Sequence, residues 1–168
     1  MRRVFAFTLL LASSSLQAGE PKLLAPGIAA PPLVVERAAG GKLSLADLRG
    51  RVVLIDFWAT WCPPCRAELP WLVKLAQRHA NEGLWFIAVN QDDVAQQRAL
   101  VGEFAPTVPG LQTWTAYGTD TVTKAWQVDG LPTLYLVDRE GRIVAGHEGR
   151  LTEEAVTRAL EQALRPRK

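Results

Sequence analysis

Two cysteines separated by two prolines are the residues best suited to chemistry in this sequence, which reads Trp61–Cys62–Pro63–Pro64–Cys65. They are the only cysteines of the 168-residue chain. A thiolate can attack a disulfide sulfur, and a second thiol close by can then release the mixed disulfide. The spacing therefore predicts thiol–disulfide exchange, with the Cys62–Cys65 couple as the redox group and no separate cofactor.

Three other uses of the pair fit the sequence less well. A purely structural disulfide over so short a loop would stabilise the fold by only about 2 kcal/mol, against roughly 4.7 kcal/mol for a loop of 100 residues. A zinc site needs two further ligands, and His79 would lie roughly 20 Å away along a continuous helix at about 1.5 Å per residue. Copper(I) favours methionine, and Met1 is the only one. No metal is therefore expected.

The elements around the pair favour a reactive thiolate at Cys62. Residues 51–58 are a nearly unbroken run of β-branched and aromatic side chains, which is typical of a strand buried on both faces. Residues 63–80 have helical spacing, and both prolines fall in the first turn, where a missing N–H costs nothing. Cys62 is thus expected at a helix N-terminus, where free N–H groups and the macrodipole lower the pKa of a thiol. Cys65 lies one turn further and can resolve a mixed disulfide.

The remaining elements alternate between strands and helices. We expect strands at 84–90, 111–115, 133–137 and 142–145, a turn at 138–141, and helices at 92–104, 120–126 and from the N-cap Thr152 to about Leu164. Two short apolar segments, 33–35 and 43–45, flank Gly40–Gly41 and predict an added N-terminal β-hairpin. This order predicts an α/β fold with a mixed central sheet and helices on both faces.

Composition and charge exclude several classes of protein. With 48% apolar and 21% charged residues, the chain is neither disordered nor of low complexity, and its length suits one domain. Arg2 and Arg3 followed by an apolar stretch and a small, polar exit are typical of a secretory signal peptide over residues 1–18. Without it the chain has 17 basic and 17 acidic residues. A neutral body gives no reason to expect a nucleic-acid partner.

We therefore expect a signal peptide (1–18), an extended lead-in (19–32) and one domain (33–165), exported to the periplasm. The alternative for the leader is an uncleaved membrane anchor. A spanning helix needs about 20 apolar residues, and this stretch is shorter and more polar. The domain is expected to be a monomer.

Two segments carry a resemblance to a known family. Residues 53–70 (VLIDFWATWCPPCRAELP) and residues 130–143 (GLPTLYLVDREGRI) resemble the two signatures of the thioredoxin superfamily. The branch they most resemble is the TlpA/ResA-like thiol–disulfide oxidoreductases of the cell envelope. The resemblance covers about residues 32–164 and implies a thioredoxin-like fold.

The resemblance also implies roles for individual residues. Cys62 would attack the substrate disulfide and Cys65 would resolve the mixed disulfide. Pro132 matches a cis-proline that faces the pair, and Leu131 would offer its backbone to a substrate chain as a short added strand. Substrate contacts are expected from four residues: Trp61, Pro63, Leu131 and Thr133. Trp58 matches the same aromatic lip as Trp61 and is the more suited of the two to core packing.

Two acids complete the expected site. Asp56 interrupts a buried strand and matches the thioredoxin acid that takes a proton from the resolving cysteine, and burial raises the pKa of a carboxylate. Envelope members often have Asn here, so Asp56 departs from that branch and favours a reductase that activates Cys65. Glu68 matches an acid that some envelope reductases use near the pair. The alternatives are a solvated Asp56 and a Glu68 favoured only by the helix dipole.

The resemblance implies a reductant of protein disulfides in the envelope, for example in cytochrome c maturation or copper-site assembly. A membrane thiol-reductant transporter would supply its electrons. One alternative is a disulfide-forming oxidant, although such oxidants carry a large helical insertion for which the chain has no room. The other is a non-catalytic thioredoxin-fold module for binding or metal delivery, against which the intact cysteine pair speaks.

Overall fold

The computed structural model describes residues 23–165, and the expected signal peptide lies outside them. These residues form a seven-stranded sheet of order β2-β1-β5-β4-β3-β6-β7. The strands are β1 (Val34–Arg37), β2 (Lys42–Ser44), β3 (Val52–Trp58), β4 (Leu84–Asn90), β5 (Thr115–Tyr117), β6 (Thr133–Val137) and β7 (Ile143–Glu148). The helices are α1 (Pro63–His79), α2 (Gln97–Phe104), α3 (Leu111–Trp114), α4 (Asp120–Ala125) and α5 (Glu153–Leu164).

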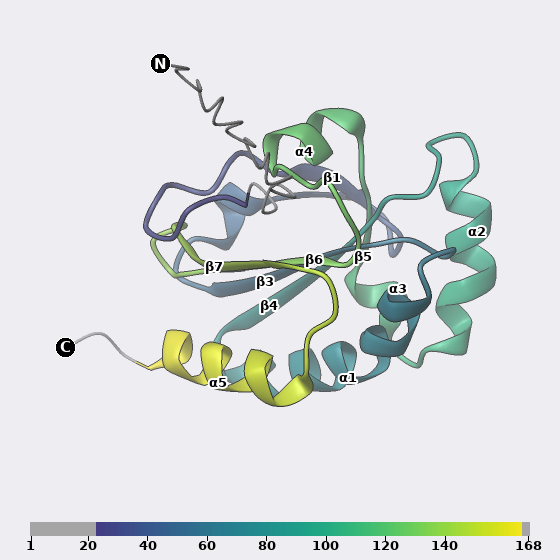
Figure 1. Cartoon of the computed structure of the whole chain (residues 1–168). Helices are drawn as coiled ribbons and strands as arrows, with labels where there is room; N and C mark the ends of the chain where they lie inside the picture. The colour runs from purple at the N-terminus through teal and green to yellow at the C-terminus, as the bar shows by residue number, and fades with distance from the viewer. Residues whose placement is uncertain (1–22, 166–168) are drawn as a thin grey trace, which may run out of the picture.

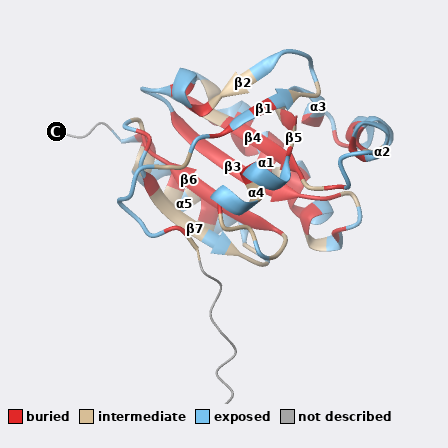
Figure 2. Ribbon diagram, turned by 90° about the horizontal axis from the view of Figure 1, so that it is seen from above, coloured by how far each residue is buried: buried red, intermediate tan, exposed pale blue. Residues whose placement is uncertain are grey.

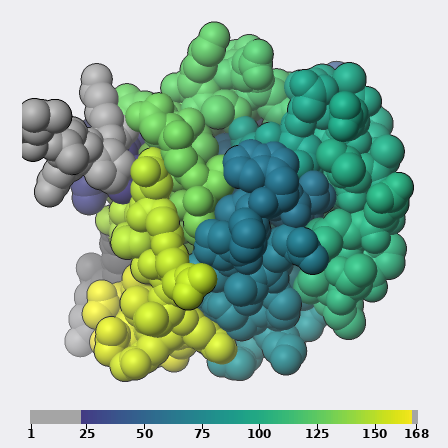
Figure 3. Space-filling model, turned by 45° about the vertical axis from the view of Figure 1, so that its right-hand side comes forward, coloured from purple at the N-terminus to yellow at the C-terminus, as the bar shows by residue number. Residues whose placement is uncertain are grey.

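The sheet is mixed and lies between helices. β4 is parallel to β3 and β5, whereas the other neighbouring strands are antiparallel. Figure 1 shows α1 and α5 below the sheet and α4 above it. In Figure 3 α1 (blue) lies between α5 (yellow) and the teal segment that contains α2. The expected α/β class with a thioredoxin-like arrangement and an N-terminal hairpin, β1–β2, is confirmed.

β3 is the central strand, and all seven of its residues are buried. Successive side chains of a strand point to opposite faces. Leu54 and Trp58 accordingly belong to the core beneath α1 and α5, whereas Ile55 and Phe57 belong to the second core on the opposite face. Figure 2 shows the central strands as the buried layer of the molecule. Because β3, β4 and β5 are parallel, the loops that follow them gather at one edge of the sheet.

Two sequence-predicted elements differ in the structure. The helix expected over 92–104 begins only at Gln97, because the Asp92 carboxylate accepts hydrogen bonds from Thr60 rather than capping a helix. The strand expected over 111–115 is the short helix α3, and β5 starts at Thr115. Gly110 has φ of 87°, a left-handed conformation that turns the chain there, and the Thr115 hydroxyl donates to the Leu111 carbonyl.

The described part of the lead-in pairs with residues 141–143, at the start of β7. The Gly27 N–H donates to the Ile143 carbonyl (2.8 Å), and the Ile143 N–H donates to the Ile28 carbonyl (2.9 Å). Leu24 is buried, and its N–H donates to the Tyr135 hydroxyl at 3.3 Å. The segment is thus attached to the sheet by backbone hydrogen bonds. Within residues 23–165 no helix has the length and apolar character needed to cross a membrane.

The Tyr135 hydroxyl is a suitable place to test this attachment. Tyr135 is fully buried, and its hydroxyl also donates to the Trp126 carbonyl at 2.9 Å. We expect Tyr135→Phe to lower the free energy of unfolding by about 1–2 kcal/mol, because a buried acceptor and a donor lose their partner. Urea unfolding measures the change. Tyr117→Phe, at a ring that is only half-buried, is the matched control, and an equal loss in both variants would contradict the assignment.

Candidate active site

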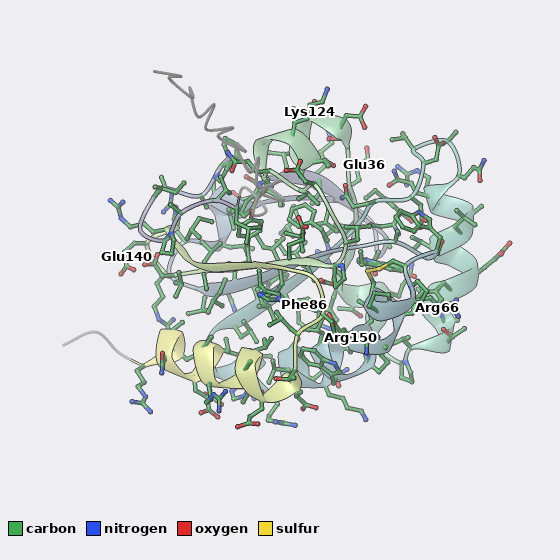
Figure 4. The ribbon with its side chains drawn as sticks, in the orientation of Figure 1. Glu36, Arg66, Phe86, Lys124, Glu140 and Arg150 are labelled. Atoms are coloured by element: carbon green, nitrogen blue, oxygen red, sulfur yellow. A yellow bond between two sulfur atoms is a disulfide. The ribbon has the colours of Figure 1, made fainter. Side chains whose placement is uncertain are left out.

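The cysteine pair lies where β3 passes into α1. Cys62 is the N-cap residue of α1, and its sulfur accepts the N–H of Cys65 at 3.3 Å. Pro63 and Pro64 occupy the first turn, as the sequence predicts. Cys62 and Cys65 are joined by a disulfide with their Cα atoms 5.3 Å apart. The yellow sulfur–sulfur bond is visible in Figure 4 near Arg66, the residue after Cys65. The reactive pair is therefore set at the positive end of a helix.

Both cysteines are buried in the disulfide form, with exposed side chains beside them. Cys65 is completely buried, and Cys62 retains 3% of its surface in the disulfide form. Beside them Trp61 is 67% exposed, and Pro63 is also exposed. Trp58, by contrast, is fully buried and packs against the Phe104 ring. The side chains that a partner meets first at the pair are therefore those of Trp61 and Pro63.

The second signature forms the neighbouring loop. The Leu131–Pro132 peptide bond is cis. Thr133 is paired with Phe57, so the loop before β6 lies beside the point where β3 leads to the cysteines. Thr133 itself is fully buried, and its hydroxyl donates to the Gly130 carbonyl at 2.7 Å. Its side chain therefore supports the loop from inside, whereas Leu131 is half-buried.

Asp56 is a buried carboxylic acid. It is 1% exposed, and neither side-chain oxygen has a hydrogen-bond partner among the described residues. By alternation along β3 it faces the same side as Leu54 and Trp58, which is the side on which Cys65 packs. Burial, and secondarily the nearby Glu68 carboxylate, hold the pKa of Asp56 well above its usual range. The structure thus excludes a solvated Asp56.

Glu68 is the second acid on this side of the sheet. It is 5% exposed, and its Oε1 accepts the Leu151 N–H at 3.0 Å. Burial raises the pKa of Glu68, while the hydrogen bond from Leu151 and the charges of Arg150 and His147 act in the opposite direction. Arg150 is labelled in Figure 4 in the segment that leads to α5. Glu68 therefore joins α1 to the start of the last helix and lies close enough to Asp56 to influence its protonation.

A third acid, Asp92, was not among the residues singled out by sequence reasoning. It is 4% exposed and bonds to Thr60, two residues before Cys62. The available signal was its position directly after β4, at the edge of the sheet where the loops after parallel strands meet. Within residues 23–165 no group of three or more histidine, cysteine or acidic residues is arranged to hold a metal ion.

Comparisons with known proteins agree with this geometry. Residues 25–164 match the family model described as Redoxin. The thiol-disulfide oxidoreductase ResA of Bacillus subtilis is 32% identical over 134 residues, which are 79% of this chain and 73% of ResA. The thioredoxin-like protein YneN of the same species is 34% identical over 139 residues, which are 80% of this chain and 78% of YneN.

Solved structures give the same result. A putative thiol:disulfide interchange protein DsbE from Chlorobium tepidum superposes with a TM-score of 0.73 at 29% identity, covering 84% of this chain and 99% of that one. Since the family model spans nearly all of the described residues, and the cysteine pair forms the expected disulfide, the chain belongs to the Redoxin family and is a thiol–disulfide oxidoreductase.

Proposed function

We propose that the protein is a reductant of protein disulfides in the cell envelope. Cytochrome c maturation and copper-site assembly are examples of pathways that need one. The observation that carries this proposal is the buried, unpartnered Asp56 carboxyl group on the Cys65 side of β3. An acid of raised pKa can take a proton from a buried thiol near neutral pH, which is the step that a reductant needs to release its substrate.

The proposed reaction begins at Cys62. Its thiolate attacks one sulfur of a substrate disulfide, so that a Cys62–substrate bond forms, the substrate disulfide breaks, and the first substrate sulfur leaves and takes a proton. Cys65 then passes its proton to Asp56 and attacks the Cys62 sulfur. The Cys62–Cys65 disulfide forms, the second substrate sulfur leaves as a thiolate and takes up the proton from Asp56, directly or through solvent, and two electrons have passed to the substrate.

Residues around the cysteine pair also have roles in the proposed reaction. Trp61, Pro63 and Leu131 would contact the substrate chain, with the cis-Pro132 loop placing the Leu131 backbone beside it. Thr133 would act by supporting that loop. Glu68 would adjust the proton affinity of Asp56. The couple itself serves as the redox group without a bound cofactor, and a membrane thiol-reductant transporter would return it to the dithiol.

We further propose that the protein is exported and works as a monomer in the periplasm. The basic and apolar leader over residues 1–18 supports this location. An oxidising compartment also provides the protein disulfides that such a reductant acts on.

The direction of electron flow can be measured directly. Equilibrium titration of the Cys62–Cys65 couple against glutathione and dithiothreitol is expected to give a reduction potential below about −200 mV, on the thioredoxin side of the range for this fold. A value near −120 mV, where strong disulfide-forming oxidants lie, would assign the protein to the opposite direction. Reduction of insulin by the dithiol form separates either activity from a non-catalytic module.

The division of labour between the thiols has its own test. Cys65→Ser removes the resolving step, so mixed disulfides with substrates should accumulate through Cys62. We expect adducts in envelope extracts that disappear on treatment with dithiothreitol. The matched control is Cys62→Ser, in which the remaining thiol is buried. Equal adducts in both variants, or none in either, would contradict the roles given to the two cysteines.

The Asp56 proposal makes a kinetic and a thermodynamic prediction. Asp56→Asn should slow the release of a preformed mixed disulfide by about tenfold or more, because the proton acceptor is lost, and should leave the first attack nearly unchanged. It should also stabilise the oxidised fold, since an unpartnered buried carboxylate is replaced by a neutral amide.

The stability gain should grow with pH. Below the ordinary pKa of an aspartate, near 4, the acid is protonated in both the folded and the unfolded state. Above it the unfolded chain ionises while the folded one, with its raised pKa, stays protonated, so the wild-type protein loses stability until the folded pKa is passed. Urea unfolding of the oxidised proteins at pH 4 and pH 8 measures this. Asp47→Asn, at an exposed aspartate, is the control, and a gain that does not increase with pH would remove Asp56 from the mechanism.

A further inference from the structure

The turn that leads into Cys62 is held by a small number of contacts. It runs from the end of β3 at Trp58 to the start of α1 at Pro63. The Cys62 N–H donates to the Ala59 carbonyl at 3.1 Å, which closes a tight turn. The disulfide to Cys65 is a second restraint, and it disappears whenever the pair is reduced. The Arg66 N–H donates to the Cys62 carbonyl at 3.1 Å and holds the Cys62 backbone at the start of α1 in either state, so other contacts are needed only to fix the turn before it, residues 59–61.

The side chain of Asp92 supplies such contacts. Its carboxylate accepts the Thr60 N–H at 3.1–3.2 Å and the Thr60 hydroxyl at 2.9 Å. It also accepts the side-chain N–H of Asn90 at 2.7 Å. All three donors are neutral, and Asp92 is 4% exposed. A carboxylate buried in this way is costly unless it keeps its donors, so it holds Thr60 firmly.

Asp92 is in turn fixed by the edge of the sheet. The Asp92 N–H donates to the Asn90 side-chain oxygen at 3.1 Å, and Asn90 is fully buried. The Gln91 N–H donates to the Trp58 carbonyl at 2.7 Å, and the Gly118 N–H donates to the Asn90 carbonyl at 2.9 Å. The ends of β3, β4 and β5 are therefore tied together directly behind Asp92.

We propose that Asp92 is the positioning residue of the active-site loop. By holding Thr60 it keeps Cys62 in register with the free N–H groups of α1 in the dithiol state, where no disulfide does so. This inference rests on the proposed function only in taking Cys62 as the attacking thiol. It assigns to Asp92 no proton transfer and no contact with substrate.

Loss of the Asp92 charge and loss of the position of Cys62 are expected to change the pKa of the Cys62 thiol in opposite directions. This makes the proposal testable. Removal of a negative charge nearby would by itself lower the pKa of the Cys62 thiol and speed its reactions. Loss of position would move the sulfur away from the helix N-terminus, so the pKa would rise and the reactions would slow. Asp92→Asn, which keeps the shape of the side chain, combines the two effects. Thr60→Ala removes one hydrogen bond and changes no charge.

The experiment compares Asp92→Asn, Thr60→Ala, Thr60→Ser and Asp93→Asn in the full chain, reduced with dithiothreitol and freed of it. Asp93 is the matched control, because it is exposed and lies one residue away, where its carboxylate caps the Ala95 N–H. The rate of Cys62 alkylation by iodoacetamide is followed across pH by peptide mass spectrometry. Thiolate absorbance in the ultraviolet gives the titration midpoint, and urea unfolding monitors stability.

We expect Asp92→Asn to slow alkylation of Cys62 at neutral pH by about tenfold, since small displacements of a reacting group have effects of this size or larger, and to raise the titration midpoint. Thr60→Ala should show a smaller change in the same direction, and Thr60→Ser and Asp93→Asn should match the wild type. An unchanged or lower midpoint in Asp92→Asn would overturn the proposal. If Asp92→Asn does not fold, the comparison of Thr60→Ala with Thr60→Ser tests the proposal. Equal alkylation rates and equal titration midpoints of Cys62 in these two variants would overturn it. Wild-type labelling mainly at Cys65 would instead contradict the proposed function.

Discussion

The burial of β3 on both faces is the constraint on which the active site depends. All seven residues of this strand are buried, so packing on both faces fixes its direction. The chain therefore enters α1 at a fixed position relative to the sheet. The cis-Pro132 loop is placed by the pairing of β6 with this strand, and the Asp92 contacts are placed by the pairing of β4 with it. Neighbours on either side of one strand therefore determine the surroundings of Cys62.

Three carboxyl groups lie close to the cysteines, and they differ in their hydrogen-bond partners and therefore in their properties. Asp92 has three neutral donors, Glu68 has one backbone donor and two cationic neighbours, and Asp56 has no partner among the described residues. A fully bonded carboxylate is rigid, and an unpartnered one binds a proton readily. Asp56 is buried on the side of β3 where Cys65 packs, with its pKa raised, and buried polar groups of this kind often mark functional sites.

Prediction from sequence succeeded where the signal is local. The apolar run of β3, the prolines at the start of α1 and the glycines between β1 and β2 each report their own structure within a few residues. The start of α2 was wrong because the partner of Asp92 is Thr60, 32 positions away, and a helix cap looks the same in sequence. The strand expected at 111–115 was wrong because the left-handed Gly110 starts a helical turn. The burial of the Thr133 side chain could not be predicted from the residues next to it in sequence either. It depends on pairing with strands that are distant in the chain.

The pairing of the lead-in with the start of β7 has a consequence for how the molecule meets other chains. An edge strand with free N–H and C=O groups is a template on which unfolded polypeptides pair and aggregate. Hydrogen bonds from residues 27–30 occupy only the start of the β7 edge, at residues 141–143, and the opposite edge is β2, only three residues long. Along residues 144–148 of β7 no described segment other than β6 pairs with the strand, so this stretch of the edge is where a further extended chain would add to the sheet.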